Sequence, residues 1–380
     1  MTLLLDKSSK PGTHAVVIGI GRYPWLVGGK AKPRFAQNDG MAQLTSPPAS
    51  ARAFATWLLE TYDNPEAPLA SLDLLLSDAK DQRFKNGSKN VEVQPATFAN
   101  VSTAIDAWAK RPTQEKDMLL FFFSGHGISA ALQTTLLCED YGSNAAAPLN
   151  QAIDFTGLVI GLDWMVARRQ CFFVDACRVA TASILEASRF FGQPVIQPKS
   201  DHNPKPRQAP VFQSTLAGQL AYGRKGKPSY FTEALLRGFA GPASDNNQDG
   251  LTWWVQADAL LRALPPLLQR VVDEPGQILP QAPGSDISNL ALHRLQQRPV
   301  GIPVDVSCVP DSRTAQAVLS YTGMSPTEKR QRKPPSGQPW QLNLAEGRYT
   351  FEAQVAAPAA KGKIADEAIR PPYRNIRIQV

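Results

Sequence analysis

Phe172-Phe173-Val174-Asp175-Ala176-Cys177-Arg178 is the stretch that decides the fold. From Cys171 to Asp175 the residues are largely apolar, and the run is too short for a helix, so it predicts a buried strand. The strand ends at a cysteine that is followed at once by an arginine. Open α/β sheets hold their ligands just beyond the carboxyl ends of their strands. Cys177 is therefore expected just beyond the carboxyl end of a strand, where such sheets have their ligand-binding and catalytic residues.

A second segment of the chain has the same form. Asp117 to Phe123 predicts another apolar strand, and it runs directly into Ser124-Gly125-His126-Gly127. If the two strands are parallel neighbours, His126 and Cys177 emerge side by side. An adjacent imidazole can take the proton of a thiol and so make the sulfur a nucleophile. The backbone N–H groups of Gly127 and Cys177 would then form an oxyanion hole.

The two motifs together resemble the caspase-like cysteine peptidases, which include metacaspases and paracaspases. Ser-Gly-His-Gly follows one strand and Asp-Ala-Cys-Arg the next, and a histidine about 50 residues before the cysteine is a known signature of caspases. The resemblance runs from about residue 13 to about residue 295. It implies an α/β fold, with a mostly parallel central sheet flanked by helices, and an endopeptidase with a Cys177–His126 dyad. That chemistry needs neither a cofactor nor a metal.

The resemblance also implies which residue selects the substrate. Asp175 stands two positions before Cys177, as in metacaspases and paracaspases, and alternation along the strand puts both on one side. We therefore expect Asp175 to bind a basic residue before the scissile bond. Relatives often carry a second acid near the start of the first helix, where this chain has Ser50. A neutral residue at the cleavage site is the alternative.

Further substrate contacts follow from the same resemblance. Residues 211–216 match the strand whose edge pairs with the peptide backbone, so Ser214, Thr215 and Leu216 are expected to bind substrate. Asp140 matches an acidic residue that many relatives carry on the loop after a strand. A peptide-binding strand favours a protein or peptide substrate over a small amide.

Composition limits the class of protein. The length of 380 residues predicts more than one domain. The net charge of +7 gives no argument for nucleic acid binding. The four cysteines form no C-x-x-C pair, so the sequence indicates neither a zinc site nor a disulfide framework. Their pattern favours a protein of a reducing compartment. No run approaches the ~20 apolar residues of a membrane span, and residues 1–11 are too short for a signal-peptide core. We expect a cytoplasmic protein that does not bind membranes.

The pattern along the chain predicts its organisation. Residues 1–12 are expected to form a tail, residues 13–298 the peptidase domain, and residues 299–380 a small antiparallel β-sandwich, Ig-like in kind. Proline-rich, basic residues 178–210 predict a mobile, cleavable linker within the peptidase domain. Helices are expected at residues 47–62, 97–110, 155–168, 229–238 and 253–264.

Three interpretations remain open from the sequence. The first is the cysteine endopeptidase, whose microbial relatives often act in stress, death or defence pathways. The second is an inactive scaffold that binds a regulatory partner through the C-terminal β domain, and the third is a different thiol hydrolase. Asp245, Asn247 and Asp249 match the first half of a calcium loop, but Gln256 stands at position twelve, which favours a hydrogen-bonded turn.

Overall fold

A computed structural model describes most of the chain. It covers residues 2–7, 10–31, 40–130, 133–176, 192–199, 205–215, 223–246, 252–272, 284–285, 288–323, 328–332 and 335–380. Cys177 and Leu216, both expected at the site, lie outside these residues. The chain divides into two compact units, one of Met1–Leu236 with Val271–Leu290 and one of Arg237–Arg270 with Ala291–Val380.

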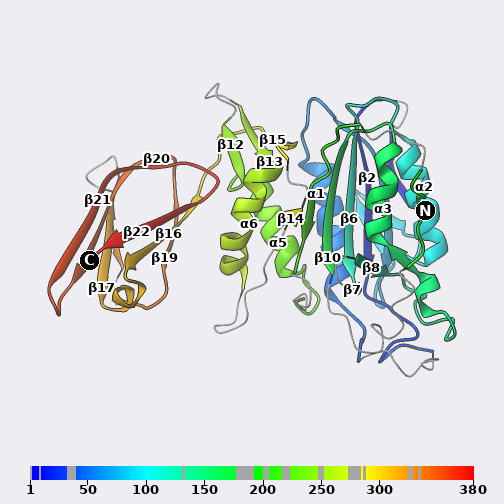
Figure 1. Cartoon of the computed structure of the whole chain (residues 1–380), viewed down its shortest axis with the longest axis horizontal. Helices are drawn as coiled ribbons and strands as arrows, with labels where there is room; N and C mark the ends of the chain where they lie inside the picture. The colour runs from blue at the N-terminus through cyan, green and yellow to red at the C-terminus, as the bar shows by residue number, and fades with distance from the viewer. Residues whose placement is uncertain are drawn as a thin grey trace. The chain divides into compact units, whose positions relative to one another are not determined.

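The first unit is built on a central sheet (Figure 1). In the described residues its strand order is β1-β3-β2-β6-β10-β11-β14. The strands are β1 Thr2–Asp6, β2 Thr13–Ile20, β3 Leu69–Ser77, β6 Met118–Gly125, β10 Arg169–Ala176, β11 Val211–Gln213 and β14 Gly284–Ser285. Neighbours from β3 to β11 are parallel, whereas β1 and β14 run antiparallel at the two edges. The mostly parallel sheet predicted from the sequence is confirmed, but residues 2–6 belong to it and are not part of a tail.

Helices cover both faces of this sheet (Figure 1). They are α1 Ser46–Glu60 on one face and α2 Phe98–Lys110 and α3 Phe155–Gly161 on the other. Adjacent phenylalanines serve the two faces, because side chains alternate along a strand. The Phe122 ring stacks on Phe54 of α1 at 4.5 Å between centroids, while Phe121 lies 5.8 Å from Phe155 of α3. The continuous apolar runs of the sequence are thus explained by burial on both sides.

The register between β6 and β10 fixes the position of the two motifs. Phe172 pairs with Phe121, and the pairing continues without a shift until Ala176 pairs with Gly125. The two motif strands are therefore parallel neighbours, which is the condition that the sequence argument for the dyad required.

Shorter elements complete the first unit. They are the hairpin β4 Arg83–Asn86 and β5 Lys89–Glu92, the small sheet of β7 Gly127–Ala130, β8 Gln133–Leu137 and β9 Ala152–Asp154, and the 3₁₀ turns η1 Pro148–Gln151 and η2 Leu162–Trp164. The helix expected at residues 155–168 is wrong in its second half, since α3 ends at Gly161. Residue Gly161 closely approaches the backbone of Ile196, where a side chain would not fit.

The second unit begins with mixed structure. A three-stranded sheet joins β12 Ser244–Asn246, β13 Trp253–Gln256 and β15 Ala291–Leu295, and the helices nearby in sequence are α5 Tyr230–Phe239 and α6 Ala257–Val271. The helix predicted from residue 253 is wrong at its start, because β13 occupies that position. Trp253, Trp254 and Val255 are aromatic and β-branched, which favours a strand when partners are available on both sides.

The C-terminal part of the second unit is a pair of β-sheets around one core. The strands are β16 Ile302–Val309, β17 Ala317–Thr322, β18 Lys329–Arg332, β19 Trp340–Leu344, β20 Gly347–Val355, β21 Ala360–Ile369 and β22 Arg374–Gln379, with the 3₁₀ turn η3 Asp311–Ala315. Their orders are β19-β16-β22 and β18-β17-β20-β21. The predicted sandwich is present, but β16 and β22 are parallel, so it is not wholly antiparallel. In the ranges that the structure describes, no helix combines the length and apolar character needed to span a membrane.

A buried histidine at the amino end of β2 makes stability depend on pH. His14 is 1% exposed, its Nδ1 lies 2.9 Å from Ser71 Oγ, and its Nε2 has no hydrogen-bond partner among the described residues. Burial lowers the pKa of His14 to about 4, with Arg111 acting in the same direction and Asp117 and Asp6 opposing. In the unfolded chain His14 therefore binds a proton below about pH 6.5, whereas in the folded chain it binds one only below about pH 4.

We expect the free energy of unfolding to fall as the pH drops from 6.5 towards 4, in part because of His14. Urea unfolding at several pH values measures this, with His14→Gln as the comparison because glutamine does not ionise. The variant is expected to lose stability less steeply than wild type over that interval. Parallel curves for the two proteins would show that His14 does not contribute.

Candidate active site

His126 lies immediately beyond the carboxyl end of β6 and is only 8% exposed. Its Nε2 atom lies 2.7 Å from the carbonyl oxygen of Ala42. A carbonyl can only accept a hydrogen bond, so Nε2 carries the proton and Nδ1 keeps its lone pair. Burial lowers the pKa of His126, and the hydrogen bond to Ala42 opposes that shift. The imidazole is therefore neutral near pH 7 and can accept a proton at Nδ1.

Asp175 lies one residue before the end of β10 and is 4% exposed. Its Oδ2 atom accepts hydrogen bonds from Ser124 at 3.0 Å, Thr232 at 3.1 Å and Ser229. Burial raises the pKa of Asp175, and these hydroxyls, with that of Ser214, oppose the increase. The carboxylate is thus held by hydroxyl groups and not by a cation among its described contacts.

Ser50 lies beside the same group of hydroxyls. Its Oγ accepts the backbone N–H of Ser229 at 3.0 Å, and it is fully buried in α1. Ser229 also donates its hydroxyl to Asp175, so Ser50 is linked to that carboxylate through Ser229 and adds no charge beside it. We call Ser50, Ser124, Ser214, Ser229 and Thr232, together with Asp175, the hydroxyl cluster. Sequence reasoning missed Ser124, Ser229 and Thr232, although Ser124 stands inside the histidine motif.

The predicted substrate strand differs from expectation. Strand β11 ends at Gln213, and its outer edge pairs with β14 at Val211 and Phe212. The exposed edge predicted for residues 211–216 is therefore wrong at these two residues, because β14 covers it. Ser214 and Thr215 are buried, and their hydroxyls donate to the carbonyl of Ala176 at 3.3 and 3.4 Å. Both residues thus contact the end of β10.

Asp140 is found at a helix start. Its Oδ1 accepts the backbone N–H of Phe98, the first residue of α2, at 2.8 Å. Burial raises the pKa of Asp140. None of its contacts among the described residues joins it to His126 or Asp175, so a role in substrate binding stays a prediction. Its neighbour Glu139 accepts from Arg22 at 2.7 Å and from Ser77 at 2.7 Å.

The three cysteines that the structure describes are unsuited to nucleophilic chemistry. Cys138, Cys171 and Cys308 are buried and free, and burial raises the pKa of each thiol. Cys177 lies outside the described residues and directly follows Ala176 in the sequence. Among the described residues no group of histidine, cysteine and carboxylate side chains is arranged to hold a metal ion. Most of the calcium-loop motif lies outside those residues.

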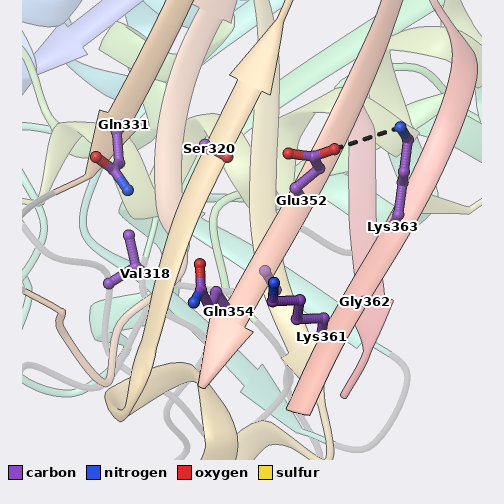
Figure 2. A pocket seen from close by; sticks show the side chains of 9 residues that line it. Val318, Ser320, Gln331, Glu352, Gln354, Lys361, Gly362 and Lys363 are labelled. Carbon is purple, nitrogen blue, oxygen red and sulfur yellow. Dashed lines mark ion pairs between the residues drawn. The ribbon is translucent and has the colours of Figure 1, made fainter. Parts of the chain in front are cut away.

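A polar hollow of about 310 Å³ lies on the face of the C-terminal sheet formed by β17, β18, β20 and β21 (Figure 2). Glu352 and Lys363 form an ion pair of 3.4 Å across it. The remaining lining residues are Val318, Ser320, Gln331, Ala353, Gln354, Lys361 and Gly362. The lining contains neither histidine nor cysteine, so this hollow offers hydrogen-bonding groups but neither a thiol nor an imidazole. The partner surface predicted for the C-terminal domain stays a prediction.

Comparison with known proteins places most of the first unit in one family. The family model of the caspase domain matches residues 13–256. The uncharacterized protein y4kE of Sinorhizobium fredii is 26% identical over 312 residues, covering 79% of this chain and 86% of that protein. A probable protease of a Desulfuromonadales bacterium is 26% identical over 265 residues, which are 65% of this chain but 28% of the relative. Caspase-1 from Spodoptera frugiperda aligns with a TM-score of 0.43 and 12% identity, over 75% of this chain and 88% of that one.

Proposed function

The chain belongs to the caspase family of peptidases, and from that premise we propose that it is a cysteine endopeptidase with a Cys177–His126 dyad. The observation that carries the proposal is the register of β6 and β10. Ala176 pairs with Gly125, and the residues that follow these two in the sequence are Cys177 and His126. Successive Cα atoms are only 3.8 Å apart, so this register supports the proposal that the thiol and the imidazole are neighbours.

The tautomer of His126 suits it to act as the base. Nε2 is engaged by Ala42, so Nδ1 is the atom available to the thiol of Cys177. In the proposed reaction Nδ1 takes the thiol proton, and the sulfur attacks the carbonyl carbon of the scissile bond. The backbone N–H groups of Gly127 and Cys177 are proposed to stabilise the oxyanion. His126 returns its proton to the leaving amine, and water then hydrolyses the acyl-enzyme.

The substrate is proposed to be a protein cleaved after a basic residue, with a neutral residue as the alternative. Asp175 supports this choice, since it is a buried carboxylate whose described partners are all hydroxyl groups. Hydroxyl groups can rotate to accept as well as donate, so they can adapt to an incoming guanidinium or ammonium group. A charge-assisted pair is roughly twice as strong as a neutral hydrogen bond.

Covalent labelling tests the proposed nucleophile. A peptidyl acyloxymethyl ketone alkylates an activated thiolate, and peptide mapping locates the label. We expect modification of Cys177 and of none of the other three cysteines, and we expect His126→Ala to slow the labelling strongly. If Cys177 is unmodified and a diverse peptide library is not cleaved, the inactive scaffold is the correct interpretation.

Self-cleavage, if it occurs, is expected between residues 178 and 208, at positions that contacts with the rest of the unit do not hold. The parts of the predicted linker that the structure describes are held by contacts, which protect a backbone from a protease. Gln193 exchanges backbone hydrogen bonds with β9, and Arg207 forms an ion pair with Asp163 at 3.2 Å. Intact mass measurement after prolonged incubation locates the cuts.

Cys177→Ala is the control for self-cleavage, because the same cuts in that variant would come from a contaminant. Cuts at residues 205–208, or only within residues 299–380, would contradict the prediction.

A further inference from the structure

The phenol of Tyr23 is bound directly to the backbone of His126. Tyr23 lies in the turn after β2 and is fully buried. Its Oη accepts the backbone N–H of His126 at 2.8 Å and donates to the carbonyl of Leu137 at 3.3 Å. The backbone N–H of Leu137 donates in turn to the carbonyl of His126 at 3.0 Å. Both backbone groups of His126 are therefore fixed, one by Tyr23 and the other by the end of β8.

The ring of Tyr23 also packs against the imidazole. The two ring centroids are 4.8 Å apart, with an angle of 52° between the planes. This close approach explains the glycine that precedes the histidine. A Cβ atom on Gly125 would lie 2.8 Å from Tyr23 Oη and 3.0 Å from the ring of Phe123. Any larger residue would push the phenol away from His126.

Gln43 connects Tyr23 to the segment that contains Ala42, whose carbonyl accepts from Nε2 of His126. Its Oε1 accepts the backbone N–H of Tyr23 at 2.8 Å, and its Nε2 donates to the Tyr23 carbonyl at 2.8 Å and to Val27 at 3.1 Å. The residue before Gln43 is Ala42, whose carbonyl accepts from Nε2 of His126. One side-chain amide thus joins the two segments that hold the imidazole.

Resting on the proposed dyad, we propose that Tyr23 is a positioning residue for His126 and that Gln43 locks it in place. Tyr23 fixes the backbone and one face of the ring, while Ala42 fixes the orientation of the ring through Nε2. Nδ1 is then held in one orientation, in which it can accept a proton from the thiol of Cys177. Displacing a reacting group by about 1 Å costs on the order of 100-fold in rate, so such positioning has a large effect.

Tyr23→Phe is the decisive variant, because it keeps the ring and removes only the hydroxyl. We expect kcat to fall by about 10- to 100-fold while KM changes little, since the interaction lost orients a reacting group. Gln43→Ala is expected to act in the same direction. Tyr62→Phe is the matched control. It also removes a phenol hydroxyl, from a partly buried tyrosine, and that hydroxyl lies 2.7 Å from Thr13 Oγ1, at the opposite end of β2.

A second measurement does not depend on turnover. The chain has four histidines, so NMR titration of ¹³C-labelled imidazoles, assigned with His126→Gln, can follow His126 alone. In Tyr23→Phe the backbone N–H loses its partner and the site opens to water. The pKa of His126 should then rise towards its ordinary value of 6.5, whereas Tyr62→Phe should leave it unchanged.

Each outcome separates this inference from the proposed function. Wild-type kcat and wild-type titration in Tyr23→Phe would overturn the positioning role while leaving the peptidase proposal intact. If wild type cleaves no peptide, the proposed function fails, and the titration of His126 still decides whether Tyr23 positions it. An equal loss in Tyr23→Phe and Tyr62→Phe would show a general effect of removing a buried hydroxyl and would also overturn the inference.

Discussion

Replacing Cys177 with alanine is expected to abolish peptide cleavage while the protein keeps its fold. The thiol is the proposed nucleophile, and none of the three described cysteines can replace it, because Cys138, Cys171 and Cys308 are buried and burial raises the pKa of each. We expect kcat/KM to fall by at least about 10³-fold. His126→Ala should lose nearly as much, since a nucleophile and its base act as a unit.

Cleavage of a fluorogenic peptide measures the loss, and thermal unfolding checks the fold. Cys138→Ala is the matched control, because it also removes one thiol from the peptidase unit. It is expected to cost some stability through the cavity it leaves and to retain activity. Full activity in Cys177→Ala or in His126→Ala, with purity shown by mass spectrometry, would refute the dyad.

Peptides with arginine before the scissile bond are expected to be cleaved about 10- to 100-fold faster than matched peptides with leucine. The reason is the buried carboxylate of Asp175, which lacks a cation among its described contacts. Because burial raises the pKa of Asp175, the preference should grow as the pH rises and the carboxyl ionises. Measuring kcat/KM for peptides with arginine, leucine or aspartate at several pH values tests both statements.

Asp175→Asn should remove the preference for arginine, since the amide keeps the shape of the side chain without its charge. Asp154→Asn is the control acid, and its selectivity should match wild type because the described partner of its side chain is Gly157 at the start of α3. A preference for leucine that persists in Asp175→Asn would show that the hydroxyl cluster only joins strand ends to α5. A preference for aspartate would exclude a basic substrate outright.

The strands that carry the motifs could be predicted because local pattern and burial agree there. β6 and β10 are buried on both faces, so their sequences are continuous apolar runs. The start of α2 was predictable to within one turn, since the sequence offered Thr97 or Asn100 as its cap and the structure has Thr97 there. Strand β1 could not be found, because a short segment at a sheet edge depends on its partner β3 more than on its own residues.

The supports of His126 were hidden for a different reason. Ala42 binds His126 through its backbone carbonyl, and because every residue has one, the identity of residue 42 does not reveal this contact. Gln43 and Tyr23 are far from His126 in the chain and belong to a loop without periodicity. The hydroxyl cluster draws on five separate segments, so only the fold brings it together. Sequence identifies the reacting groups, and contacts distant in the chain determine how they are held.

The hydroxyl cluster has a consequence for a chain that is cut in its linker. Asp175 and Ser124 lie before residues 178–210, whereas Ser229 and Thr232 lie after them. The same division runs between β10 and β11, which are hydrogen-bonded neighbours in one sheet. A nick in the linker would thus leave two polypeptides that share a single core and a single active site. They would separate only on unfolding, so proteolysis would convert one chain into a non-covalent heterodimer without releasing either part.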